Sequence, residues 1–279
     1  MTVLFNKREA IEFLGLDSKV FDNFFKNASE FEALPRPHNR GFFKFDSSLL
    51  AKWKADYNSR TVSLNKEDYA LCLDFALAMH FRGYVASDFN TGRQREFGQK
   101  VTNWVKGQLG EVGLQKFMKE KFGIEIELDF NIYNEIVPQD IIGLFENNKH
   151  RKPRVGVGIK SSKPKSAYLI LGEKEVTLPE RRSDIYVYCR VDIPDDHLLR
   201  IARSNIISAV EKGPLYDSYK ENIPHFIDIK CEVVGWCRYD ELETVTSIPG
   251  QNFDGIRKVK QSGKLRRSDS DWQELISFL

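Results

Sequence analysis

Three side chains near the middle of this chain could together hydrolyse a phosphate diester: those of Glu111, Asp140 and Lys160. Carboxylate oxygens are the ligands that Mg2+ prefers, and bound Mg2+ makes a water molecule easier to deprotonate and stabilises charge on a phosphoryl group. A lysine ammonium at the same place can orient the attacking water. The competing interpretation is an ordinary cross-strand ion pair between Asp140 and Lys160, worth less than about 1 kcal/mol when exposed.

Glu111 is expected on the buried face of a helix that starts near Gln99. Glu111 stands seven residues after Trp104 and seven before Met118, and apolar residues recur between them at a spacing of three to four. A carboxylate on this apolar stripe costs free energy unless a partner is present. Glycines beside it, each about 1 kcal/mol less favourable than alanine in a helix, indicate that something approaches this face closely; they are Gly107, Gly110 and Gly113.

The other two residues are expected on neighbouring strands. Residues 124–132 alternate apolar and polar without a break, and Asp140 to Phe145 and Arg154 to Lys160 are two further strand candidates. If the last two form a hairpin folded about residues 149 and 150, Asp140 falls opposite residue 159 or 160. Cross-strand neighbours have Cβ atoms about 5 Å apart, so Asp140 and Lys160 would meet. Gly156, Gly158 and Lys160 share one face, which we expect to be open to a ligand.

The order of these elements resembles the PD-(D/E)XK nuclease superfamily, and in particular the type II restriction endonucleases. The matching half-motifs are Pro138-Gln139-Asp140 and Gly158-Ile159-Lys160, and the resemblance covers roughly residues 97–192. It implies an α+β fold with an α/β core, in which an αβββαβ mixed sheet is flanked by helices.

One departure from the family pattern concerns a metal ligand. The acidic residue that the family usually places two positions before the lysine is Gly158 here. Glu111, Asp129 or Glu175 could supply the missing acid, and we favour Glu111, since helix glutamates complete the site in relatives of this kind.

The resemblance implies a site-specific endonuclease that cuts double-stranded DNA with one or two Mg2+ ions. Asp140, Glu111 and the backbone carbonyl of Ile159 would hold the metal, and Lys160 would act on the attacking water. At the end of the strand, DNA phosphates would be bound by Ser161, Ser162 and Lys163. A homodimer is expected, because one such site cuts one strand. The alternatives are a repair or junction-resolving nuclease of the same core, and a DNA-binding regulator whose nuclease core has decayed.

The first 60 residues predict two short helices, a basic turn, a strand and a third helix. Asp17 and Asp46 are suited to cap two of these helices. The order resembles the winged helix-turn-helix of the excisionase and MerR type, preceding the nuclease-like part. It implies major-groove contacts from Lys19, Asn23 and Lys26, and wing contacts from Arg36, His38 and Arg40. The alternative is a small helical docking domain without DNA contact.

We expect three parts: residues 1–60 as this DNA-binding domain, 61–96 as a helical linker and 97–279 as the nuclease-like domain. Within the linker, Arg93 and Arg95 could contact phosphate or could be solvated surface charge. Residues 184–191 and 227–236 predict further strands, and 269–279 a closing helix. The basic, glycine-containing segment 253–267 is expected to be a loop or arm.

Composition excludes several other kinds of function. The net charge of +2 is by itself weak evidence for nucleic acid. The histidines form no HExxH or HNH-like group, the cysteines have no metal-type spacing, and no Walker-type loop is present, so no nucleotide cofactor is expected. No run of 18 apolar residues and no signal peptide occur, which predicts a cytoplasmic, prokaryotic protein without membrane contact.

Overall fold

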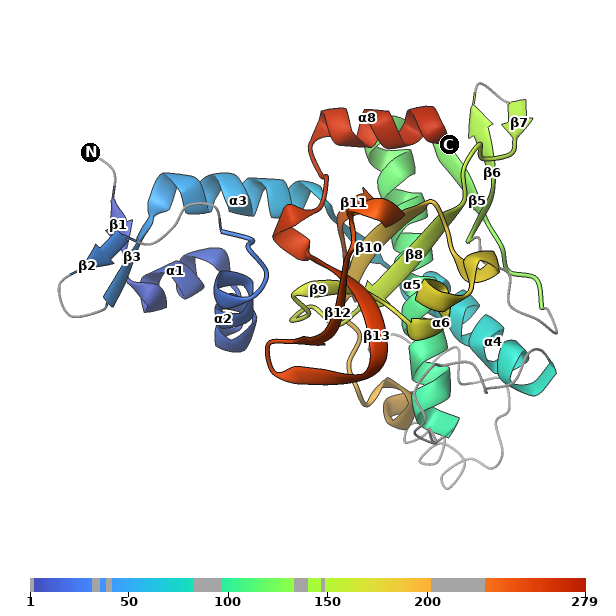
Figure 1. Ribbon diagram of the computed structural model, residues 1–279, viewed down its shortest axis with the longest axis horizontal. Helices are drawn as coiled ribbons and strands as arrows, with labels where there is room; N and C mark the ends of the chain where they lie inside the picture. Colours follow the sequence, from blue (N-terminus) through green and yellow to red (C-terminus); the bar gives the residue numbers. More distant parts are fainter. Residues whose placement is uncertain are drawn as a thin grey trace, which may run out of the picture.

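The computed structural model describes residues 3–31, 36–38, 42–82, 97–132, 140–146, 149–201 and 229–279. Helices and several sheets, one of them mixed, form an α+β arrangement, which agrees with the expected fold class at this coarser level. Figure 1 shows a small N-terminal unit on one side and a larger body built around the mixed sheet on the other. In the described residues no helix is long and apolar enough to cross a membrane.

The mixed sheet has the strand order β4-β11-β10-β8. Its members are β4 (Thr61–Leu64), β8 (Val157–Ser162), β10 (Ile185–Val191) and β11 (Ile229–Arg238). β8 runs parallel to β10, whereas the other two pairings are antiparallel. Every residue of β10 is buried, because both faces of this central strand are covered by other parts of the chain.

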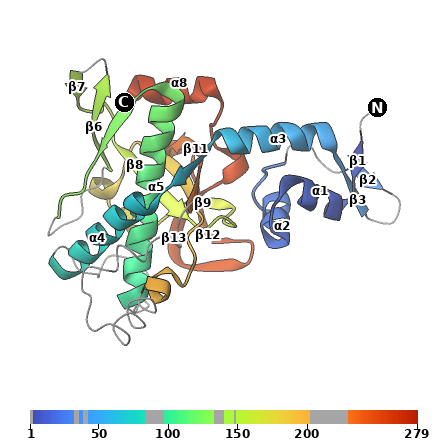
Figure 2. The same cartoon turned by 180° about the vertical axis from the view of Figure 1, so that it is seen from behind.

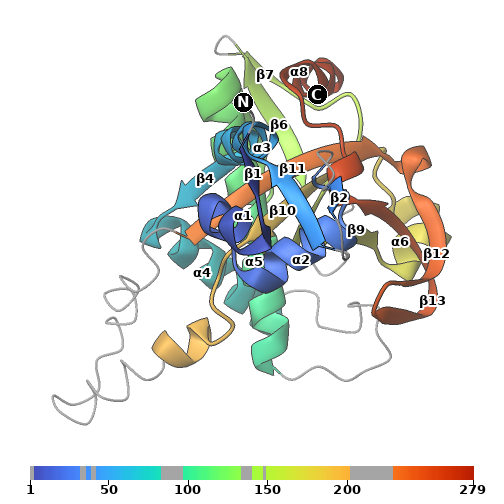
Figure 3. The same ribbon diagram turned by 90° about the vertical axis from the view of Figure 1, so that its left-hand side faces the viewer.

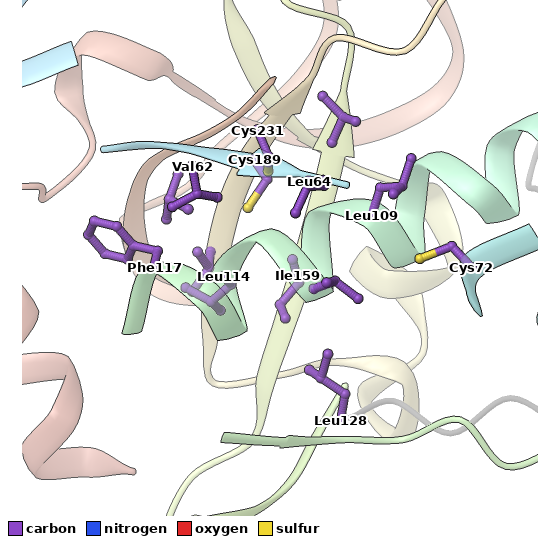
Figure 4. Packing of buried hydrophobic residues seen from close by; sticks show 14 of the residues in the cluster. Val62, Leu64, Cys72, Leu109, Leu114, Phe117, Leu128, Ile159, Cys189 and Cys231 are labelled. Atoms are coloured by element: carbon purple, nitrogen blue, oxygen red, sulfur yellow. The ribbon is translucent and has the colours of Figure 1, made fainter. Parts of the chain in front are cut away.

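Helix α5 (Phe97–Phe122) packs across one face of this sheet, with α4 (Lys66–Arg82) beside it (Figure 2). The packing is close because two helix positions lack side chains: a Cβ at Gly110 would lie 1.8 Å from Ser161 Oγ, and one at Gly113 would lie 2.2 Å from Cys231 Sγ. The approaching partner that these glycines predicted is therefore the sheet. Figure 4 shows the resulting core, in which Leu109, Leu114 and Phe117 face apolar residues of the strands.

The segment expected to be a linker belongs in part to this core. β4 forms the edge of the mixed sheet by pairing with β11, and α4 buries Tyr69, Cys72 and Leu73 in the same hydrophobic cluster. Residues 61–82 are therefore an integral part of the larger body. Arg93 and Arg95 lie outside the described residues.

A separate three-stranded sheet carries the strand that follows Asp140. It consists of β5 (Glu125–Leu128), β6 (Ile141–Glu146) and β7 (Lys149–Arg151), all antiparallel. The predicted hairpin between residues 140–145 and 154–160 is wrong, because β6 turns back at once on β7, where Glu146 pairs with Lys149. β8 instead joins the mixed sheet.

The N-terminal unit contains the elements that the sequence predicts. Helices α1 (Lys7–Leu14) and α2 (Ser18–Lys26) precede a hairpin of β2 (Arg36–His38) and β3 (Phe42–Asp46), to which β1 (Leu4–Phe5) adds a third strand. Asp17 and Asp46 cap α2 and α3 (Ser47–Ser59), as expected. α3 runs from this unit to β4 in the larger body (Figures 1 and 3).

A fourth sheet contains the strand that follows β8 in the chain. It has the order β12-β13-β9, in which β13 (Gln251–Gln261) pairs antiparallel with both β12 (Glu243–Ile248) and β9 (Tyr168–Leu171). The short helix α6 (Glu173–Thr177) follows β9, and α8 (Asp269–Phe278) closes the chain. The expectation of a loop or arm at 253–267 is wrong, because most of this segment is strand β13.

A closed ring of alternating charge joins the N-terminal unit to the larger body. Glu30 contacts Arg190 and Arg267 at 3.0 and 2.6 Å. The far side of the ring contains three further pairs: Arg190 with Glu232 at 3.0 Å, Glu232 with Arg60 at 2.9 Å, and Arg60 with Asp56 at 3.0 Å. Arg267 closes it at 3.8 Å from Asp56. We call this set the charge ring.

Candidate active site

Backbone hydrogen bonds hold Asp140 beside strand β8. The Asp140 N–H donates to the Val157 carbonyl at 3.2 Å, and the Ile159 N–H donates to Asp140 Oδ2 at 2.6 Å. The carboxylate is therefore fixed at the residue directly before Lys160. The expected neighbourhood of residue 140 with residues 159 and 160 is present, although it arises from contact between two sheets and not from a hairpin.

Glu111 is buried on α5, as its position on the apolar stripe predicts, with 7% of its surface exposed. Gln108 donates from Nε2 to Glu111 Oε1 at 2.7 Å, which supplies one polar partner. Burial, and next the charge of Asp140, raise the pKa of Glu111 well above its usual range. Glu111 and Asp140 are thus close enough to oppose each other's ionisation.

The pKa of Asp140 is also raised. Burial raises the pKa of Asp140 to about 6, against the opposing influence of Lys160 and of the Ile159 N–H. Glu175 and Asp129 also raise it. The two carboxyls resist ionisation mainly because they are buried and in part because other carboxylates lie near them, and a cation would favour their charged forms.

Lys160 points to this cluster and is paired with Glu175. Its Nζ lies 2.6 Å from Glu175 Oε1 and 5.8 Å from the centre of the Tyr186 ring. Burial alone would lower the pKa of Lys160, but Glu175 and Asp140 raise it above its usual range, so the side chain stays an ammonium. Glu175 Oε2 accepts the Gly172 N–H at 3.0 Å, which anchors this acid at the start of α6.

The face of β8 that carries Gly158 is covered by protein. A Cβ at Gly158 would lie 2.8 Å from Ser183 Oγ and 3.0 Å from Tyr186 Cε1. Tyr186 is the partner of Gly158 in the parallel pairing with β10, and its ring occupies the space that a side chain would need. The expectation that this face is open to a ligand is therefore wrong at Gly158, and a side chain at this position would have to displace Ser183 or Tyr186.

The donor set fits Mg2+ by its chemistry. Asp140, Glu111, Glu175 and the Ile159 carbonyl are all hard oxygen donors, and Mg2+ is commonly held by one or two carboxylates with water completing its shell. Among the residues that the structure describes, no group of three or more His, Cys, Asp or Glu side chains converges as a ready-made metal cage.

The predicted phosphate contacts at the end of β8 are placed beside this cluster. Ser161 Oγ donates to the Gly107 carbonyl at 3.3 Å, and Ser162 Oγ lies 2.5 Å from the Tyr188 hydroxyl. Lys163 forms an exposed ion pair with Asp195 at 2.6 Å. Ser161 therefore faces α5 and Ser162 faces Tyr188, so these two neighbours lie on opposite faces of β8.

Of the predicted groove contacts on α2, Lys19 and Lys26 are exposed. Asn23 is half-buried and donates from Nδ2 to the Lys165 carbonyl, so it faces the larger body. Arg36 and His38 lie in strand β2, whose side chains are outside the described part of the structure, as is Arg40. The hairpin expected for the wing is present in its backbone pairing.

A pocket of about 440 Å3 opens beside Lys160. Its walls come from α2, from the segment that follows β8 and from the tip of the β12–β13 hairpin. This pocket could not be predicted from the sequence, because its three walls come from segments far apart along the chain. Lys160 thus lies between the carboxylate cluster and a pocket.

Glu175 forms an ion pair with Lys160 that was not predicted from the sequence. It was one of three candidates for the acid missing at position 158, of which Glu111 was favoured. The signal that could have found it is the capping pattern of Gly172 with Glu175, which places a carboxylate at a helix start directly after a buried strand.

Comparison of the chain with protein-family models, with curated proteins and with solved structures gives no match.

Proposed function

We propose that this protein is a Mg2+-dependent endonuclease that hydrolyses phosphodiester bonds in double-stranded DNA at specific sites, as type II restriction enzymes do. The observation that supports this most is the meeting of Asp140, Glu111 and the Lys160–Glu175 pair where the middle of α5 crosses β8. An ordinary surface ion pair would not need beside it a buried glutamate and a partly buried aspartate, both with raised pKa values.

Each residue has a role that follows from its surroundings. Asp140 and Glu111, with the Ile159 carbonyl, would hold the metal, and Glu175 takes the place of the acid missing at Gly158. The metal would lower the pKa of the attacking water and stabilise charge on the phosphoryl group. Lys160 remains an ammonium, so it orients this water and stabilises developing negative charge on the phosphate oxygens.

The experiment is incubation of the protein with plasmid DNA of mixed sequence and magnesium chloride. Discrete linear fragments support the proposal. Asp140→Ala and Lys160→Ala should abolish cutting and leave binding to DNA largely intact. Cutting by both variants at the wild-type rate would remove the site assignment. The metal requirement is tested by adding EDTA to the wild-type protein. Cutting should be lost in EDTA and restored by excess Mg2+.

The same assay separates two alternatives. A repair or junction-resolving nuclease of the same core would cut bulged or branched DNA and leave plain duplex intact. A DNA-binding regulator would retain binding without cutting, and Gly158 favours this alternative, since the acid of the family pattern is absent there. Cutting of both strands of a palindromic site would require a homodimer, which sedimentation of the complex with DNA would measure.

A further inference from the structure

The pocket beside Lys160 has three walls of different chemistry. Asn23 and Asn27 on α2 form one wall. The second is the end of β8 with the turn that follows it, in which the Ser166 N–H donates to the Lys163 carbonyl at 2.9 Å. The third is the tip of the β12–β13 hairpin. The volume of about 440 Å3 is within the range of about 300–1,000 Å3 that is typical of small-molecule sites.

One end of the pocket has the chemistry of a phosphate site. Lys160, Lys165, Ser162 and Ser166 line it, and their side chains carry two ammonium groups and two hydroxyls. Lysines and hydroxyl side chains are among the groups that contact phosphate oxygens in complexes with nucleic acids. The pocket therefore offers an anion both charge and hydrogen-bond donors at its border with the carboxylate cluster.

The rest of the pocket has the chemistry of a base site. Tyr168 and Ile170, both half-buried, present an aromatic ring and an aliphatic side chain. Asn27 and Gln251 add amide side chains, which can donate and accept hydrogen bonds at the edge of a base. Both surfaces suit a flat heterocycle with polar edges.

The hairpin wall is held in one conformation by its turn. Ile248 pairs with Gln251, which leaves Pro249 and Gly250 as a two-residue connection, and Gly250 has a φ of +79°. Proline followed by a residue with positive φ is the pattern of a type II turn, in which proline restricts the first position and glycine allows the second. This wall is therefore preformed.

We propose that this pocket binds a single unpaired nucleotide of the substrate strand, with its phosphate toward Lys160 and its base toward Tyr168 and Gln251. The inference rests on the proposed nuclease function and names the form of DNA that the site takes. A stacked base pair cannot enter a pocket of this volume, because its neighbours in the duplex would have to enter with it. A nucleotide swung out of the helix can enter, as in enzymes that extract a base.

The test is calorimetric titration of the full-length protein with the four deoxynucleoside 5′-monophosphates, with deoxynucleosides and with inorganic phosphate. Saturable binding of at least one nucleotide at one site per chain, tighter than binding of phosphate, is the expected result. Gln251→Trp should weaken this binding at least tenfold by filling the pocket. Gln251→Ala should weaken it about 2- to 10-fold, the effect of one hydrogen bond.

Asn252→Trp is the matched control, because Asn252 is the exposed neighbour of Gln251 on the same strand and does not line the pocket. It should bind nucleotides as the wild type does. Equal affinity for phosphate and nucleotides, absence of nucleotide binding, or equal loss in Gln251→Trp and Asn252→Trp would overturn the inference. Nucleotide binding by a protein that cuts no DNA would leave the pocket assigned and reject the nuclease proposal. Plasmid cutting without nucleotide binding would support the nuclease proposal and reject the nucleotide pocket.

Discussion

Replacement of Glu30 by glutamine should weaken the attachment of the N-terminal unit. Glu30 is 1% exposed, and its two carboxylate oxygens accept from Arg190 at 3.0 Å, from Ser262 Oγ at 2.6 Å and from Arg267 at 2.6 Å. Burial by itself would raise the pKa of Glu30, but the arginines lower it from 4.5 to about 2. The charge ring therefore stabilises the ionised form of Glu30, and the ionised carboxylate stabilises the folded protein.

The size of the effect follows from this pKa. A difference between 4.5 and about 2 corresponds to about 3 kcal/mol of folding free energy, since one pKa unit is worth about 1.4 kcal/mol. Removing one partner of a buried ion pair typically costs about 3–5 kcal/mol, which agrees. We therefore expect Glu30→Gln to lower the free energy of unfolding at pH 7 by about 3 kcal/mol.

The assay is urea denaturation followed by tryptophan fluorescence, repeated from pH 7 downward. Because the pKa of Glu30 is lowered on folding, its contribution is complete above pH 4.5 and is lost as the pH falls toward 2. The gap between wild type and Glu30→Gln should shrink over that range. Glu12→Gln, at an exposed glutamate of the same unit, should change little. A loss below about 1 kcal/mol at pH 7, or a gap that does not depend on pH, would refute the reasoning.

Other expected outcomes concern the site and the core. Glu175→Gln should slow DNA cutting at least tenfold with binding unchanged, whereas Glu173→Gln on the same helix should cut normally; equal rates in both would remove Glu175 from the site. Gly110→Ala should cost about 1–3 kcal/mol of stability by overpacking against Ser161, whereas Gly107→Ala, with nothing within 4 Å, should stabilise by up to about 1 kcal/mol in thermal unfolding. Burial lowers the pKa of His197 from 6.5 to about 4, so its contribution to stability is complete above pH 6.5 and is lost as the pH falls toward 4; His197→Gln should flatten that part of the melting-temperature profile, and an unchanged profile would contradict this.

The local elements were predictable from sequence because they depend on local patterns. The apolar stripe around Glu111 correctly predicted both the helix and the burial of this carboxylate. The caps at Asp17 and Asp46 were also correct. Alternation of apolar and polar residues located β5 and β10, although β5 ends at Leu128 and not near residue 132. Periodicity thus identifies an element but leaves its ends uncertain.

Pairing between elements could not be read from the same patterns. A short turn between β6 and β7 and the longer predicted hairpin are both compatible with the sequence. The sequence of a strand that ends near residue 146 does not indicate which later strand it pairs with. β13 was not predicted because only two of its eleven residues, Arg257 and Val259, are buried, so its apolar alternation is weak. Glu175 lies fifteen residues after Lys160 in sequence, and only the docking of α6 brings the two side chains together.

The bare backbone of Gly110 has a consequence beyond packing. Ser161, which occupies the space beside Gly110, immediately follows Lys160, and Glu111 immediately follows Gly110. The spacing between helix and strand at this crossing is therefore also the spacing between an acid and an ammonium. A methyl group added at Gly110 would push the helix away from the strand. It would thereby separate Glu111 from Lys160 without changing either side chain.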